Sequence, residues 1–204
     1  MSKITIILGT AHGINVAGKC SPDGKFREYA FSREICKRVK TELDKLGYEV
    51  YIDKIEDKVE LPQSIELINR VAIVNNICKK KGARNCVYVS IHVNAAGNGR
   101  AWYNASGFSV FVSYNASDNS KRLATMFGAN ALRRDLCGNR SMDAIKKYNT
   151  ANLYVLRKTN CPAVLTENMF QDNEKDVAFL MSEEGKKEIV NLHVETINSY
   201  CKSL

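Results

Sequence analysis

The stretch CVYVSIHV at residues 86–93 is the clearest strand in the sequence, because β-branched and aromatic residues make up most of it. A second stretch, ITIILG at residues 4–9, is a continuous β-branched and apolar run. Such a run is typical of a strand that is buried on both faces of its sheet. Strands of this kind belong mainly to parallel sheets whose two faces are covered by helices. The two stretches therefore favour an α/β fold.

Segments with helical periodicity separate the strand-like stretches. In residues 28–46, apolar side chains recur at helical spacing, and this stripe stops at Gly47. We predict helices at residues 28–46, 64–81, 118–136 and 182–200, and strands at residues 4–9, 48–52, 86–93, 108–113, 152–156 and 163–166. Asp118 or Ser120 is the expected cap of the third helix. The alternation predicts an α/β layer fold with a mainly parallel sheet, and no linker or repeat divides residues 1–204 into several domains.

Length and composition are those of a folded globular domain. The chain has 204 residues, of which 45% are hydrophobic and 25% are charged, and these values exclude disordered, collagen-like and coiled-coil chains. No apolar run reaches the roughly 18 to 20 residues that cross a bilayer. We expect no membrane span, and no signal peptide, because the apolar stretch that follows Met1-Ser2-Lys3 is too short. The seven cysteines are scattered and odd in number, so we predict reduced thiols, mostly in the core.

The formal net charge of +8 implies affinity for polyanions, such as nucleic acid, an anionic membrane surface or an acidic cell-wall polymer. One hypothesis is therefore a non-catalytic basic domain that binds an anionic polymer. It is supported by the basic clusters at residues 79–84 and 133–134. Clusters of this kind are usually solvated helix faces, and aromatic residues are not interleaved with these two as single-strand binding requires. We expect no specific nucleic-acid partner.

Three ionisable residues stand at or just beyond the ends of predicted strands. His12 follows the first strand, His92 lies near the end of CVYVSIHV, and Glu167 ends the strand AVLTE. In open parallel sheets, ligands bind beyond the carboxyl ends of the strands. Two imidazoles and a carboxylate at one edge can hold a catalytic divalent metal that keeps one position for water. A further glutamate nearby can take the proton of that water.

Structural roles are the alternative for each of these residues. A histidine at a strand end is often a hydrogen-bonded polar side chain, and Glu167 can cap a helix or form a salt bridge. Glu28, in KFREYAFS, would ordinarily be a solvated glutamate in the first turn of a helix, where the helix dipole favours it. We interpret His193, on the amphipathic closing helix, as structural. The pattern alone does not select Glu28 from the 22 acidic residues.

Four short strings occur in a characteristic order along the chain: GTAHG, REYAFS, VSIHVNA and AVLTENMFQDN. In this order and at these spacings they resemble the zinc-dependent N-acetylmuramoyl-L-alanine amidases of type 3, a family that includes bacterial autolysins and phage endolysins. The most specific pieces are SIHxNA at residues 90–95 and ExxFxxN at residues 167–173. The resemblance runs from Ile4 to the closing helix, which is essentially the whole chain.

The resemblance implies that His12, Glu28 and His92 bind one zinc ion. It also implies that Glu167 is the catalytic carboxylate beside a zinc-bound water, which is the nucleophile. The substrate would be peptidoglycan, and the bond cleaved would be the amide between N-acetylmuramic acid and L-alanine. Asn94, in the SIHxNA string, is a candidate substrate-binding residue. The implied fold is a twisted, six-stranded, mostly parallel sheet flanked by helices.

Two stretches depart from the family pattern. The family usually has Asp-x-Gly-His-Gly, whereas this chain has GTAHG at residues 9–13 and lacks the acidic residue. If that residue orients the imidazole, another hydrogen-bond acceptor must do so here. RSMDAIKKYNT at residues 140–150 differs from an Arg-Gly-rich stretch that we associate with peptide-stem specificity. This difference bears on stem specificity more than on catalysis. A separate alternative keeps the zinc and changes the bond, namely a zinc peptidase that cuts within the stem.

We expect residues 1–204 to be one catalytic amidase domain without a separate cell-wall-binding module. An endolysin without a signal peptide would be made in the cytoplasm and would act on the cell wall after release. A trimmed form of an autolysin would instead be secreted. In either case the net charge of +8 would hold the enzyme near an anionic wall. The oligomeric state is open.

Overall fold

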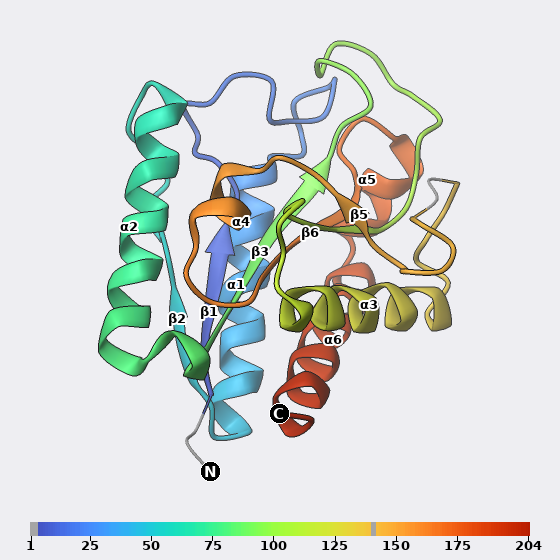
Figure 1. Cartoon of the computed structure of the whole chain (residues 1–204). Coiled ribbons are helices and arrows are strands. Elements are labelled where there is room, and N and C mark those ends of the chain that lie inside the picture. Colours follow the sequence, from blue (N-terminus) through green and yellow to red (C-terminus); the bar gives the residue numbers. More distant parts are fainter. Residues whose placement is uncertain (1–3, 140–141) are drawn as a thin grey trace.

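In the computed structural model, which describes residues 4–139 and 142–204, six strands form one sheet in the order β2-β1-β3-β6-β4-β5 (Figure 1). The strands are β1 (Thr5–Thr10), β2 (Glu49–Ile52), β3 (Cys86–Asn94), β4 (Ser109–Val112), β5 (Asn149–Thr150) and β6 (Ala163–Phe170). All neighbouring pairs are parallel except β4 and β6. The predicted six-stranded, mostly parallel α/β sheet is confirmed. Met1-Ser2-Lys3 and the first two residues of the 140–150 stretch lie outside the described residues.

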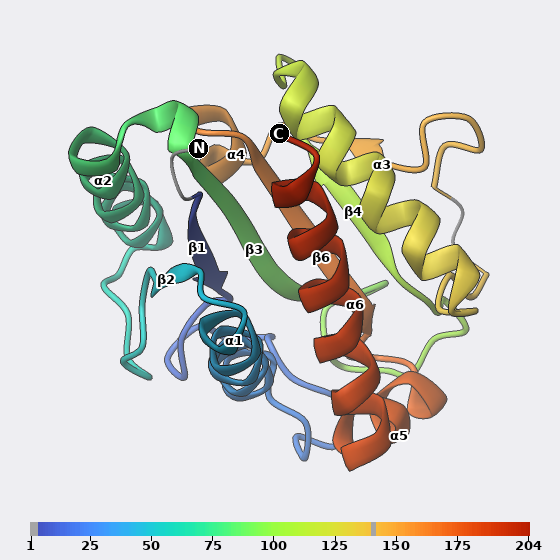
Figure 2. The same ribbon diagram turned by 90° about the horizontal axis from the view of Figure 1, so that it is seen from below.

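Helices cover both faces of the sheet (Figure 2). They are α1 (Glu28–Lys45), α2 (Gln63–Lys81), α3 (Asp118–Arg133), α4 (Tyr154–Lys158), α5 (Glu174–Met181) and α6 (Glu183–Lys202), with a 3₁₀ turn, η1, at Ala83–Asn85. On one face α1, α3, α5 and α6 enclose the larger hydrophobic core. On the other face α2 and α4 enclose a smaller core. No helix among the described residues is both long and apolar enough to cross a membrane.

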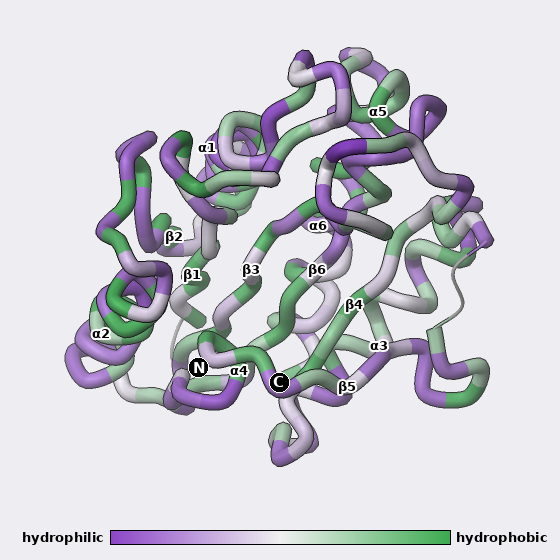
Figure 3. Tube along the Cα trace, turned by 90° about the horizontal axis from the view of Figure 1, so that it is seen from above, coloured by the Kyte–Doolittle hydropathy of each residue, from purple (hydrophilic) through white to green (hydrophobic). Residues whose placement is uncertain are grey.

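The buried strands supply side chains to both cores in alternation. In β1, Ile6 and Leu8 belong to the larger core, and Ile7 between them belongs to the smaller one. The same alternation in β3 sends Val89 to one core and Tyr88 to the other. Successive side chains of a strand point to opposite faces, so a strand that is covered on both faces must be apolar throughout. In Figure 3 much of the hydrophobic colour lies on the strands of the sheet, and much of the hydrophilic colour lies on the outer loops.

The structure corrects the predicted strand at residues 152–156. This segment enters the short helix α4, and the sixth strand is instead the two-residue β5. A short apolar run has no clear period, so its sequence does not distinguish a strand from a buried helix. Here Val155 and Leu156 become buried by packing in the same core as α2, and this tertiary contact decides the conformation.

Three smaller predictions concern the cap of α3, the end of β6 and the state of the cysteines. The cap of α3 is Ser117, whose hydroxyl accepts a hydrogen bond from the Ser120 backbone N–H, rather than Asp118 or Ser120 itself. β6 continues to Phe170, so Glu167 lies within a strand and not at its end. All seven cysteines are free thiols, and four of them are buried, as predicted.

Candidate metal centre

The site lies at the carboxyl ends of two neighbouring parallel strands. β1 and β3 are paired from Thr5 to Thr10, so His12, just beyond β1, emerges beside the end of β3 where His92 stands. Helix α1 begins at the same end of the sheet, and Glu28 is its first residue (Figure 1). The fold therefore brings together three side chains that are far apart in the chain: His12 and His92 are separated by 80 positions.

The donor atoms of these three side chains converge. His92 Nδ1 lies 3.1 Å from Glu28 Oε1, and His12 Nε2 lies 3.6 Å from Glu28 Oε2. The two imidazole rings stand nearly perpendicular, with their centroids 5.2 Å apart. If one ligand atom is taken from each of the three residues, these atoms all lie within 4.8 Å of one another. Among the described residues this is the one group of three or more potential metal ligands.

Glu28 is the buried centre of this group. Its side chain is 1 % exposed, and its Oε1 accepts a hydrogen bond from the Val93 backbone N–H at 3.1 Å. Burial alone would raise the pKa of this carboxyl, but the hydrogen bond with His92 and the neighbouring His12 bring it below its usual value. Its Oε2 has no hydrogen-bond partner among the described residues. The role of a solvated first-turn glutamate is therefore excluded, and a buried anionic oxygen is left facing the imidazoles.

His12 is held in a backbone conformation that is rare for residues other than glycine, with φ of +37°. Its carbonyl accepts hydrogen bonds from Arg33 Nη2 at 2.9 Å and from Arg70 Nη2 at 3.1 Å. The N–H of Ala11 donates to Ser32 Oγ at 2.8 Å. Such backbone strain persists where surrounding contacts impose it, and it is concentrated at functional sites. Burial lowers the pKa of His12 to about 3, so the imidazole is neutral, as a metal ligand must be.

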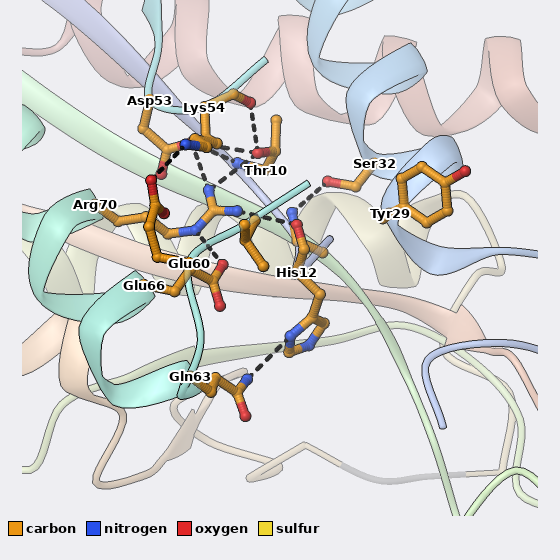
Figure 4. Close-up of polar contacts among 12 residues, drawn as sticks. Thr10, His12, Tyr29, Ser32, Asp53, Lys54, Glu60, Gln63, Glu66 and Arg70 are labelled. Carbon is orange, nitrogen blue, oxygen red and sulfur yellow. Dashed lines mark hydrogen bonds and ion pairs between the residues drawn. The ribbon is translucent and has the colours of Figure 1, made fainter. Parts of the chain in front are cut away.

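Arg70 belongs to a buried polar network that lies beside His12 (Figure 4). Its guanidinium donates to Asp53 Oδ1 at 2.8 Å, to Thr10 Oγ1 at 3.0 Å and to Glu66 Oε1 at 2.7 Å. Because a buried charge is costly unless it is paired and hydrogen-bonded, these contacts account for an arginine that is 3% exposed. The network fixes the backbone from which the His12 ring projects.

Glu167 lies on the strand next to His92 and at the same register, since His92 and Glu167 are partners in the pairing of β3 with β6. Its Oε2 is buried and has no hydrogen-bond partner among the described residues. Burial, and then the negative charge of Glu28, raise the pKa of Glu167 well above its usual value. Glu167, His12 and His92 line one cavity of about 210 Å³. A carboxyl group in this position can hold and transfer a proton beside the donor set.

The predictions for His193 and Asn94 have different outcomes. His193 is fully buried, with Nε2 3.0 Å from Thr166 Oγ1 and Nδ1 2.8 Å from the Ile189 carbonyl oxygen, and this confirms its structural role. Asn94 ends β3, but it does not line the cavity, and its Oδ1 accepts from the Ala95 N–H at 2.9 Å. Its part in substrate binding stays a prediction.

Sequence reasoning missed the residues that support the ligands. These are Ser32 and Arg33 on α1 and Gln63 and Arg70 on α2. Ser32 and Arg33 follow Glu28 by about one helical turn. Helical spacing could therefore have predicted that they lie near the same side of α1 as Glu28. The two residues of α2 contact His12 across more than 50 positions of the chain, and no local pattern encodes that contact.

The residues present fit a zinc ion. Two imidazole nitrogens and one carboxylate oxygen form a known three-residue set for catalytic zinc, in which a further position stays open. Glu28 Oε2 supports this fit: it is buried and has no hydrogen-bond partner in the described part of the chain, and a buried anionic oxygen needs one. The three side chains are therefore a donor set that can hold a metal ion at one edge of an α/β domain.

The chain belongs to the N-acetylmuramoyl-L-alanine amidase family, type 3, whose family model matches residues 6–199. It is 29% identical over 206 residues to an endolysin of Bacillus phage SPP1, a match that covers 97% of this chain and 65% of the endolysin. The chain thus spans slightly less than two thirds of the length of this relative.

Solved structures share the fold over the whole chain. An N-acetylmuramoyl-L-alanine amidase from Clostridium difficile 630 superposes with a TM-score of 0.82 at 24% identity, covering 100% of this chain and 99% of that one. An N-acetylmuramyl-L-alanine amidase from Mycobacterium smegmatis has a TM-score of 0.82 at 19% identity and covers 98% of both chains. At these identities the likeness concerns the fold.

Proposed function

We propose that this protein is a zinc-dependent N-acetylmuramoyl-L-alanine amidase that hydrolyses the amide between N-acetylmuramic acid and L-alanine in peptidoglycan. The observation that carries the proposal is the convergence of His12, Glu28 and His92 beside the buried Glu167. Membership of the amidase family supports the choice of bond. The match to a phage endolysin supports action on the cell wall.

Each of the four side chains has a distinct part in the proposed reaction. His12, Glu28 and His92 would hold one zinc ion. When bound, zinc supplies a nucleophilic water of lowered pKa and polarises the carbonyl under attack. Glu167, kept protonatable by burial, would accept a proton during attack and deliver it to the departing amine of L-alanine. The arginine contacts to the His12 carbonyl would keep the ligand set in place throughout.

The wall substrate also suits the charge of the chain. Peptidoglycan carrying anionic polymers would attract a protein of net charge +8. We propose residues 1–204 as one catalytic domain that acts on the wall.

The proposal is tested by the Glu167→Gln variant, which keeps the shape of the side chain and removes its ability to carry the proton. We expect lysis of purified peptidoglycan to fall by roughly 100- to 10,000-fold, the usual contribution of a general acid or base. Zinc content should stay at one ion per chain. Glu174→Gln, at an exposed position of α5, is the matched control and should keep full activity.

The released ends identify the bond. An amidase exposes the amino group of L-alanine, and a peptidase that cuts within the stem exposes a different amino terminus. Near-normal lysis by Glu167→Gln would refute the role of Glu167. A new amino terminus other than that of L-alanine would replace the amidase with the stem peptidase. Salt-sensitive binding to an anionic polymer without hydrolysis would favour the basic binding domain.

A further inference from the structure

Helix α2 reaches the candidate metal centre through two side chains on one of its faces. Gln63 is its first residue, and Arg70 follows seven positions later, which is about two helical turns and places both on the same side. Arg70 Nη2 donates to the His12 carbonyl at 3.1 Å, and Gln63 Nε2 lies 3.1 Å from His12 Nδ1 (Figure 4). One face of α2 therefore contacts both the backbone and the ring of His12.

The two ring nitrogens of His12 have different surroundings. Nε2 faces Glu28 Oε2 at 3.6 Å, whereas Nδ1 faces Gln63. A metal that is shared with Glu28 takes the lone pair of Nε2, so the ring proton must reside on Nδ1. That proton then needs an acceptor, because a ligating histidine normally donates its other N–H. The stretch GTAHG around His12 contains no acidic side chain that could accept it.

The Gln63 amide can supply that acceptor. A glutamine side chain carries a donor nitrogen and an acceptor oxygen, and a half-turn of the amide exchanges the two at the same place. We propose that Gln63 is a positioning residue for His12, whose amide oxygen accepts the Nδ1 proton and so keeps Nε2 available as a ligand. This inference rests on the proposed function in one respect, namely that the metal is bound by His12, Glu28 and His92.

A purely structural role for Gln63 would look different. As the first residue of α2 it could close the helix end, but the helix has no side-chain cap. Among the described residues, the hydrogen-bond partner of the Gln63 side chain is His12. Gln63 is also exposed, so replacing it should leave the unfolding temperature nearly unchanged. Metal binding and folding stability therefore separate the two roles.

The test compares the zinc affinity of four chelator-stripped proteins by competition with a chromophoric chelator. Gln63→Leu removes the acceptor, and we expect it to bind zinc roughly 10- to 100-fold more weakly than the unaltered protein. Gln63→Glu keeps an acceptor of similar shape and should bind zinc at least as tightly as the unaltered protein. Ser64→Ala, at the adjacent exposed position, is the control and should match the unaltered protein.

NMR tests directly whether the Nδ1 proton of His12 is held by residue 63. In the zinc-loaded protein, NMR should show an exchange-protected Nδ1–H of His12 that persists in Gln63→Glu and is lost in Gln63→Leu. Unchanged affinity together with a retained, protected Nδ1–H in Gln63→Leu would overturn the assignment of Gln63 alone. Failure of the unaltered protein to bind zinc would instead refute the proposed metal centre, and the assignment of Gln63 with it.

Discussion

His193 and His12 are both largely buried histidines, yet their hydrogen bonds give them different capacities. Both ring nitrogens of His193 are occupied, one by the Thr166 hydroxyl and the other by the Ile189 carbonyl. His12 has Gln63 at one nitrogen and leaves the other facing Glu28 and the cavity. A histidine whose two nitrogens are both engaged within the core is not available as a metal ligand, and this distinguishes the two.

The burial of His193 makes folding stability depend on pH. Burial lowers its pKa to about 4, whereas in the unfolded chain it is about 6.5. Below about pH 6.5 the unfolded state binds the proton more readily than the folded state, so stability falls as the pH drops from about 6.5 towards 4. The total effect of this one group is about 3 kcal/mol, at about 1.4 kcal/mol for each unit of pKa difference.

Urea unfolding at pH 7, 6, 5 and 4 measures this dependence. His193→Gln lacks the titrating ring, so its stability should fall less between pH 6 and 4 than that of the unaltered protein, although it starts lower. The other titrating groups are common to both proteins and cancel in the difference. Parallel curves for the two proteins would show that His193 does not contribute.

At the scale of elements, the start of α3 shows how a helix end is selected. The chain offers Ser117, Asp118 and Ser120 within four positions, and each is a residue type that favours an N-cap. The structure selects Ser117, because its extended backbone lets the hydroxyl accept from the Ser120 N–H at 3.2 Å. Which of several adjacent candidates caps a helix depends on where the preceding chain turns.

Ser117→Ala should therefore destabilise the protein by about 1 kcal/mol, the usual cost of losing a side-chain N-cap. Asn119→Ala, at an exposed position in the first turn of the same helix, serves as the control. Its effect should stay within about 0.5 kcal/mol. Thermal or urea unfolding of both variants gives the comparison, and an equal loss in the two would contradict Ser117 as the cap.

For the molecule as a whole, the proposed metal centre would cross-link three elements that already pack together in the fold. His12 follows β1, Glu28 begins α1 and His92 belongs to β3. An ion held by all three binds the folded state and not the unfolded chain, so it stabilises the fold as a whole. Local variants at distant elements such as α3 should leave that effect unchanged.

Zinc should raise the unfolding temperature of the chelator-stripped protein. Free zinc at about 100 times its dissociation constant adds about 2.7 kcal/mol. At about 2 to 4 °C for each kcal/mol in a chain of this size, the expected rise is roughly 5 to 11 °C. A chelator should reverse it, and His92→Ala should show little or none because a ligand is missing. A shift of equal size in His92→Ala would mean that zinc binds elsewhere.

The α/β fold could be predicted from the sequence, and the residues of the candidate metal site could be named once the family resemblance was added. Continuous apolar runs require burial on both faces, and helical stripes require a sheet to pack on, so β1, β3, α1 and α6 followed from local patterns. Resemblance of short strings to a family then pointed to His12, Glu28, His92 and Glu167, and the structure brings these four residues together. The periodicity of the sequence alone does not distinguish Glu28 from an ordinary glutamate in the first turn of a helix.

Tertiary packing, rather than any local pattern, accounts for the helical state of α4, the burial of Glu28 and the support of His12 by Gln63 and Arg70. The 5-residue α4 carries too little periodicity to specify its own conformation, and the contact between Gln63 and His12 joins positions 51 residues apart. Local patterns report the preference of a segment and the faces it must bury. They do not report which distant side chain will meet it, because that depends on how the sheet and its helices pack together.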